Sequence, residues 1–258
     1  MASELAVVQA FIVGAAVGSF LNVCIVRLPA NESVVRPASR CPRCRKPIAW
    51  FDNLPLLSWL VLRGRCRHCR EPISWQYPLV ELVVALIWAA VACWWGLTVT
   101  ALSGALFATI LLGIAVTDAR HYLIPDEYTY GGLAIGLALS LFGELGPYRG
   151  MLTAVIGAAV GFALLFVVGV LGRWMFKEDA MGGGDIKMMA MVGTFVGWKG
   201  VLLTIFLGAL AGSIIFVPLT LRKKRLVPFG VFLAVGALVT FLVGDAIITW
   251  YLNFVQFG

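Results

Sequence analysis

Two aspartates stand out because each lies at the edge of an apolar run. Asp118 closes one run, and Asp185 follows the glycines 182–184 immediately before another. Carboxyl groups near hydrocarbon are costly and usually serve a pathway, a partner or a reaction. Two carboxyl groups held together do not ionise together readily, so one can act as a base toward water while the other donates a proton to a carbonyl oxygen. If the two residues meet, the pair predicts peptide-bond cleavage by aspartic-protease chemistry.

Each of these acids also has a simpler structural interpretation. Asp118 could form an ion pair with Arg120 at a helix end, and Asp185 could cap the N-terminus of its own helix. Asp126 begins an apolar run directly after a proline, and capping explains it well. It also lies near enough to Asp118 along the chain to be a supporting acid.

Three other polar residues have weaker claims to a function. Glu81 and Asp245 lie within apolar runs, and Glu81 is expected about one helical turn inside the cytoplasmic face, where it could contact the polar segment or a ligand. His121 lies three residues after Asp118, but two ligands without a third are weak support for a metal site.

Four of the six cysteines form two pairs, Cys41-Pro-Arg-Cys44 and Cys66-Arg-His-Cys69, separated by the 21 residues 45–65. Two knuckles of this form place four thiolates around one Zn²⁺, and the neighbouring arginines favour thiolate over thiol. The polar segment that carries them, 27–76, is too short to bury a large core. One structural zinc ion would supply the energy that orders it.

The alternative for these cysteines is a pair of disulfides or a redox relay, which the reducing compartment expected for this segment disfavours. His68 is interpreted as a solvated residue of its knuckle rather than as a ligand. Cys24 and Cys93 lie inside apolar runs and are interpreted as small buried side chains.

The composition excludes an ordinary soluble domain. Of the 258 residues, 61% are hydrophobic and 13% are charged, and the mean hydropathy is +0.94. We therefore expect an all-α polytopic membrane protein with about eight transmembrane helices and a small cytoplasmic zinc-binding domain between the first two. The expected spans are 5–26, 77–96, 98–117, 128–145, 150–172, 186–198, 200–221 and 229–251. The span that begins at residue 186 is short and compatible with a tilted or partly embedded helix.

The basic residues set the orientation. With both termini outside, Arg149 and Lys199 are the only basic residues outside, and the other 18 of the 20 lie inside. The domains expected are a first transmembrane helix at 1–26, the cytoplasmic four-cysteine domain at 27–76, and a membrane aspartic peptidase domain at 77–258. The net charge of +7 does not indicate nucleic acid, because the basic residues gather in inner loops. The tract 222–225 suits anionic lipid headgroups.

The order of these motifs resembles the bifunctional type IV prepilin leader peptidase and N-methyltransferase family of bacteria over nearly the whole chain. The resemblance rests on Gly18-Ser-Phe-Leu-Asn-Val with Arg27-Leu-Pro, the two cysteine knuckles, Asp118 with Ile124-Pro125-Asp126, and Gly182-Gly-Gly-Asp185.

The resemblance implies that Asp118 and Asp185 are the catalytic pair. It further implies removal of a short basic leader from prepilins or type II secretion pseudopilins, at the cytoplasmic face of the bacterial inner membrane. Methylation of the new N-terminal amine with S-adenosylmethionine would follow. The sequence contains no Gly-rich Rossmann fingerprint, so the residues that bind this methyl donor are not assigned, and the resemblance points only to the first span and the cytoplasmic domain.

Two other classes of protein remain open from the residues alone. A transporter with a regulatory zinc module would use its acids to relay ions or protons, and such acids are expected near mid-membrane rather than at one edge. A purely structural assembly protein would tolerate the loss of both carboxyl groups.

Overall fold

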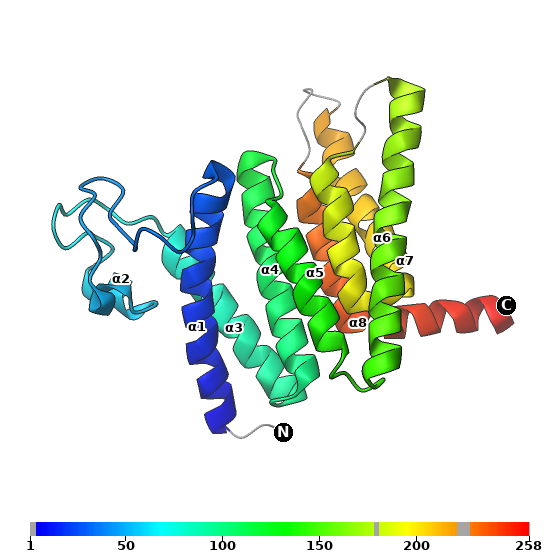
Figure 1. Ribbon diagram of the computed structural model, residues 1–258, viewed down its shortest axis with the longest axis horizontal. Helices are drawn as coiled ribbons and strands as arrows, with labels where there is room; N and C mark the ends of the chain where they lie inside the picture. The colour runs from blue at the N-terminus through cyan, green and yellow to red at the C-terminus, as the bar shows by residue number, and fades with distance from the viewer. Residues whose placement is uncertain (1–3, 178–180, 221–227, 258) are drawn as a thin grey trace. The chain divides into compact units, whose positions relative to one another are not determined.

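The structure is a computed structural model that describes residues 4–177, 181–220 and 228–257. Six helices in these residues are long and apolar enough to cross a membrane (Figure 1). They are α1 (Glu4–Arg27), α3 (Gln76–Trp95), α4 (Val99–His121), α6 (Pro147–Phe176), α7 (Gly183–Thr220) and α8 (Phe229–Phe257). The prediction of an all-α polytopic membrane protein is confirmed. The basic tract at 222–225 lies outside the described residues.

Each of the eight expected spans is a helical segment of the structure, and the number of long apolar helices in the described residues is six for two reasons. The expected span 128–145 is the helix α5 (Asp126–Ser140), whose 15 residues fall short of the roughly 20 needed to cross a bilayer. The expected spans 186–198 and 200–221 are both present, as the two arms of α7 on either side of Gly197 (φ 66°, ψ 178°).

Gly197 reverses the direction of the chain. Before it, Gly161 of α6 lies against Met189; after it, Gly200 lies against Thr240, and Gly212 lies against Phe232. The second arm therefore runs back along α8 toward the end at which α7 began. Figure 1 shows the two arms in yellow and orange, running in opposite directions. A positive φ of this kind is accessible to glycine at little steric cost.

The chain divides into two compact units, Met1–Ala105 and Leu106–Gly258. In the first unit, α1 packs against α3 through Gly14, which lies against Ala85 and Trp88, and through Gly18, which lies against the backbone of Glu81. Between these helices the chain forms the short helices η1 (Leu28–Ala30), η2 (Trp50–Asn53) and α2 (Leu57–Val61). Small residues let helix backbones approach closely, as is common in membrane proteins.

In the second unit, Gly157 of α6 and Gly193 of α7 lie backbone against backbone. The ring of Phe107 from α4 stacks on that of Phe195 at 4.4 Å between centroids, and it lies 5.4 Å from that of Phe241 on α8. Phe107 is fully buried. This aromatic contact fixes α4, α7 and α8 to one another at the end of the unit that lies away from Asp118. The sequence-based division at residue 77 stays a prediction.

Candidate active site and metal centre

Asp118 lies in the last turn of α4, where the N-terminus of α8 meets it. Its side chain is buried, with 6% exposed. Its Oδ2 accepts a hydrogen bond from the backbone N–H of Val231 at 3.2 Å, and the backbone of Gly230 also donates to the carboxylate. The first turn of a helix has free N–H groups that suit an anion. The start of α8 therefore fixes the orientation of the Asp118 carboxyl group.

Ile124 links this carboxyl group to the start of α7. A Cβ added to Gly230 would lie 2.8 Å from the Cδ1 of Ile124 and 2.9 Å from the Oδ2 of Asp118. A Cβ added to Gly184 would lie 2.9 Å from the Cβ of the same isoleucine. Both glycines leave room for the buried Ile124 side chain, which brings the turn before Asp185 close to the turn that holds Asp118.

Asp185 lies in the first turn of α7 and is half-buried. Its N–H donates to the carbonyl of Gly182 at 3.1 Å, and its carboxylate accepts a hydrogen bond from the Gly182 backbone. The Asp185 carboxylate therefore does bond to a backbone N–H at the start of its own helix, as the capping interpretation predicts. The carboxyl groups of Asp118 and Asp185 are also close enough for their charges to interact. Residues 67 positions apart in the sequence are thus brought together.

Asp126 forms an ion pair rather than a helix cap. The Nζ of Lys187 lies 2.7 Å and 2.8 Å from the two carboxylate oxygens of Asp126, and it lies 5.4 Å from the ring centroid of Tyr130. The N-cap position of α5 is Pro125, without a side-chain cap hydrogen bond, so the capping prediction for Asp126 is wrong. Asp126 begins the helix one residue too late to cap it. Its partner Lys187 follows Asp185 by two residues and ties the starts of α5 and α7 together.

Sequence reasoning overlooked Lys187 and Gly230. Lys187 follows the acid of the glycine-rich motif on an otherwise apolar helix, and this was a usable signal. Gly230 gave no signal, because nothing in the sequence indicates that the start of the last helix returns to Asp118.

The four cysteines form a second site, in the first unit. The Sγ atoms of Cys41, Cys44, Cys66 and Cys69 all lie within 4.8 Å of one another, and those of Cys41 and Cys69 are 3.7 Å apart. Thiolates placed tetrahedrally about a metal at 2.3 Å would be about 3.8 Å apart, whereas a disulfide bond is about 2.05 Å long. Among the described residues, this is the one group of three or more potential ligands gathered closely enough to hold a metal ion. The donor set fits such an ion.

The two knuckles have the same backbone structure. In the first, the N–H of Cys41 donates to the carbonyl of Lys46 at 3.0 Å, and Arg45, at a positive φ of 57°, donates to the carbonyl of Cys41 at 2.9 Å. The second knuckle repeats both bonds from Cys66. Backbone N–H groups of Cys69 and His68 lower the pKa of the Cys66 thiol to about 7, whereas desolvation and the neighbouring thiols raise the pKa of Cys69 to about 11.

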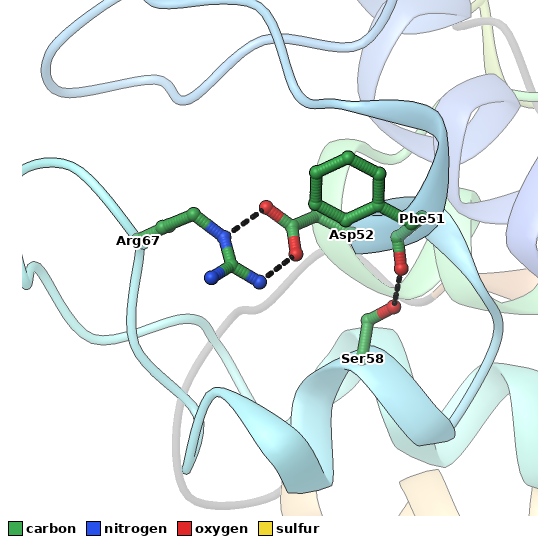
Figure 2. Close-up of polar contacts among 4 residues, drawn as sticks. All are labelled: Phe51, Asp52, Ser58 and Arg67. Carbon is green, nitrogen blue, oxygen red and sulfur yellow. Dashed lines mark hydrogen bonds and ion pairs between the residues drawn. The ribbon is translucent and has the colours of Figure 1, made fainter.

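An ion pair joins the second knuckle to η2 (Figure 2). The guanidinium of Arg67 donates to both carboxylate oxygens of Asp52, at 2.6 Å and 2.5 Å, and lies 5.5 Å from the ring centroid of Phe51. The hydroxyl of Ser58 on α2 donates to the carbonyl of Phe51 at 3.0 Å. The hydrogen bonds from Arg67 lower the pKa of Asp52 below its ordinary value of 3.8. These contacts connect the cysteine cluster to η2 and α2.

The other residues singled out in the sequence have these positions. Glu81 is buried, and its Oε2 accepts a hydrogen bond from the N–H of Leu56 at 2.8 Å, so the expected contact with the polar segment is present. His68 is exposed and is not part of the cysteine cluster. His121 and Asp245 are also exposed.

The prediction for the two remaining cysteines is half right. Cys24 is buried as expected. Cys93 is exposed, which corrects the expectation that it is a buried side chain. Val91 and Ala92 occupy the buried face of α3 at this level, and Cys93 lies beyond it.

The fold and the paired acids together define an integral membrane protein with two interacting aspartates at converging helix ends, which is the arrangement of a membrane aspartic peptidase. The chain belongs to the type IV leader peptidase family. The model of that family matches residues 105–217, and the model described as the bacterial peptidase A24 N-terminal domain matches residues 12–95.

Several curated relatives carry the name prepilin leader peptidase/N-methyltransferase. The protein of Myxococcus xanthus is 38% identical over 84% of this chain, which spans 64% of that relative's length. The protein of Pseudomonas aeruginosa is 35% identical over 95% of this chain and 93% of its own length. The protein of Neisseria gonorrhoeae is 31% identical over 97% of this chain and 96% of its own length. No solved structure was found to match the chain.

We expect Asp52→Asn to weaken the metal site without removing a ligand. Loss of the charge-assisted bonds to Arg67 should let a chelator extract a metal ion from the cysteine cluster a few-fold faster, with a modest effect because Arg67 is half exposed. Since the pKa of Asp52 is lowered in the folded protein, the contribution of the pair is present above pH 3.8 and is lost as the pH falls through the lowered pKa. Metal release followed with a coloured chelator measures this. Glu32→Gln, at an exposed site of the same unit, is the control, and equal release rates would contradict the role of the pair.

Proposed function

We propose that this chain removes the basic leader peptide from type IV prepilins or type II secretion pseudopilins with the aspartate pair Asp118 and Asp185, and then methylates the new N-terminal amine. The observation that carries the proposal is that two carboxyl groups, at the end of α4 and the start of α7, lie close enough for their charges to interact in a member of the type IV leader peptidase family. The relatives' name supports both activities.

The chain's own residues suit general acid–base hydrolysis. Between two neighbouring carboxyl groups, one takes a proton from the attacking water while the other gives a proton to the carbonyl oxygen of the scissile bond. The N–H groups of Gly230 and Val231 hold the Asp118 carboxyl group in one orientation. Gly182 and Gly183 are exposed beside Asp185, so an extended peptide can approach without meeting a side chain.

The location follows from charge and from the helix ends. We place the protein in the bacterial inner membrane with the acids at the cytoplasmic face, because a topology in which α5 and each arm of α7 also cross the membrane leaves 18 of the 20 basic residues inside. The same rule retains a basic leader in the cytoplasm while the apolar helix of the substrate stays in the lipid bilayer. Enzyme and substrate would then meet at the membrane edge.

The cysteine cluster is proposed to hold one structural Zn²⁺ through Cys41, Cys44, Cys66 and Cys69. Four thiolates at tetrahedral spacing are typical of closed structural zinc sites. S-adenosylmethionine is the proposed methyl donor, and it supplies an electrophilic methyl group. We place the methyl-acceptor site in the part of the chain formed by the four-cysteine domain and its flanking helices, α1 and α3.

The position of the acids does not favour the alternative of an ion- or proton-coupled transporter. A relay of protons needs acids near the middle of the membrane, whereas Asp118 lies in the last turn of its helix and Asp185 in the first turn of its own. Carboxyl groups at helix ends, with the glycines 182–184 directly before Asp185, suit a peptide substrate better than an ion pathway.

Replacing either acid tests the peptidase proposal. Asp118→Asn and Asp185→Asn should each lower leader cleavage by about a thousand-fold or more, because an amide neither accepts nor donates the catalytic proton. Cleavage of a synthetic prepilin by the purified protein measures this, and an unchanged melting curve in detergent shows that the fold persists. Asp245→Asn, on the exposed side of α8, is the matched control. Substantial cleavage by either variant at the paired positions would sink the proposal.

Gly230→Ala tests the support of Asp118 by α8. The added Cβ would lie 2.9 Å from the Oδ2 of Asp118 and 2.8 Å from Ile124, so the carboxyl group must move. We expect cleavage to fall roughly ten- to hundred-fold, since small displacements of a catalytic group are costly. Gly131→Ala on α5 is the control, because nothing lies within 4 Å of its added Cβ. Equal activity of the two variants would show that the position of Asp118 does not depend on α8.

The zinc proposal predicts one zinc ion per chain in purified protein. Cys41→Ser should lower the zinc content and the thermal stability, because three thiolates hold the metal less tightly and the polar segment depends on it for order. Cys93→Ser, outside the cluster, should leave both unchanged. Elemental analysis that finds no metal, together with four oxidised thiols, would rule the zinc site out.

A further inference from the structure

Glu81 is a buried carboxylate that the peptidase proposal does not use. It lies on α3 in the first unit and is 8% exposed. Its Oε2 accepts the N–H of Leu56 at 2.8 Å, and the hydroxyl of Ser19 on α1 also bonds to it. No lysine, arginine or histidine among the described residues forms an ion pair with it. A buried charge is normally paired, so an unpaired carboxylate indicates that a cation from outside the chain is expected there.

Asn22 supplies the second observation. It is 1% exposed, and its Nδ2 donates to the carbonyl of Tyr77 at 3.0 Å, while its Oδ1 has no hydrogen-bond partner. Asn22 follows Ser19 by three residues on α1, and Tyr77 precedes Glu81 by four on α3, so each pair shares one helix face. The orphaned oxygen therefore lies in the α1–α3 seam within about one turn of Glu81.

Gly18 has no side chain, so α1 and α3 lie close together at this point. A Cβ added to Gly18 would lie 2.8 Å from the Cα of Glu81 and 3.2 Å from the carbonyl oxygen of Val80. Because α1 and α3 approach so closely at this point, a ligand here would be small at its bound end and would be shielded from water.

The chemistry of the cluster selects the ligand. The Glu81 carboxylate and the orphaned oxygen of Asn22 are acceptors, which excludes phosphate and carboxylate ligands. A divalent metal would take six or more oxygen ligands, more than this cluster offers. A primary ammonium group has three N–H donors, no acceptor and one positive charge. It matches the charge and the hydrogen-bonding capacity of this site.

We infer that Glu81, Ser19 and Asn22 form the binding site for the free N-terminal amine of the cleaved substrate, the methyl acceptor. The inference rests on the proposed function, because leader cleavage is the step that frees such an amine at the start of an apolar helix. Glu81 lies five residues into α3, or about 7.5 Å from its first residue, so an amine at the end of a membrane-embedded helix can reach it.

The carboxylate also accounts for the proton that methylation must remove. The ammonium group gives one proton to Glu81 and becomes a neutral amine with a free electron pair. The amine nitrogen then attacks the methyl carbon of the sulfonium donor; the N–C bond forms, the S–C bond breaks, and its electron pair remains on sulfur. A secondary ammonium and a neutral thioether result, so that charge and atoms balance.

Glu81→Gln separates the charge from the structural contact. The amide oxygen of glutamine can still accept the N–H of Leu56, so the fold, the zinc content and leader cleavage should stay at the wild-type level. Methylation of a pre-cleaved peptide should fall at least about a hundred-fold. Glu32→Gln, which is exposed in the same unit, is the matched control and should change neither activity.

A binding measurement without the methyl donor gives an independent readout. Wild-type protein in detergent should bind a synthetic mature-pilin peptide with a free amine at least about ten-fold more tightly than its N-acetylated form, and Glu81→Gln should lose this preference. If the Glu81→Gln variant methylated the peptide at the wild-type rate, the inference would be overturned. Loss of zinc or of cleavage together with methylation would overturn it too, because Glu81 would then be structural. Failure of the proposed function differs from both, since the wild type itself would then cleave no prepilin.

Discussion

The absence of water from the hydrocarbon core is the constraint on which this structure depends. Each buried N–H and carbonyl must be bonded within a helix, so polar chemistry is confined to places where helices end. Asp118 closes α4, Asp185 opens α7, and the free N–H groups that bond Asp118 belong to the first turn of α8. The candidate active site is therefore a meeting of helix termini rather than a pocket lined by helix interiors, and a shift of any one terminus would change its geometry.

Glycine makes such a meeting possible because side chains would keep the termini apart. Gly184 and Gly230 both lie against Ile124, so one buried isoleucine sets the spacing between the turn of Asp185 and the turn of Asp118. The ion pair between Lys187 and Asp126 adds a polar tie between the starts of α7 and α5. In the first unit, Gly18 also permits a close approach of helices, since α1 lies near enough to α3 for Ser19 to bond to Glu81 and for Asn22 to bond to the carbonyl of Tyr77 one turn away.

The features predicted well from the sequence were those with a local signature. Apolar runs of the right length gave the helices, and the repeated spacing of Cys41, Cys44, Cys66 and Cys69 indicated one cluster, whose sulfur atoms the structure brings within 4.8 Å. Contacts between distant segments had no such signature. The bond from α8 to Asp118 and the partner of Asp126 depend on how helices pack, so Gly230 and Lys187 were overlooked, and capping was wrongly assigned to Asp126.

The two units differ in how they treat water, and the difference suits two reactions. Hydrolysis consumes a water molecule, and Asp185 is half-buried beside exposed glycines, where water and an extended peptide can both enter. Methyl transfer to an amine needs a nitrogen whose electron pair is not held by water or by a proton. The seam around Glu81 offers burial, a proton acceptor and no competing cation among the described residues. A single open site could not meet both requirements, because the water that one reaction consumes would solvate the amine that the other must keep free.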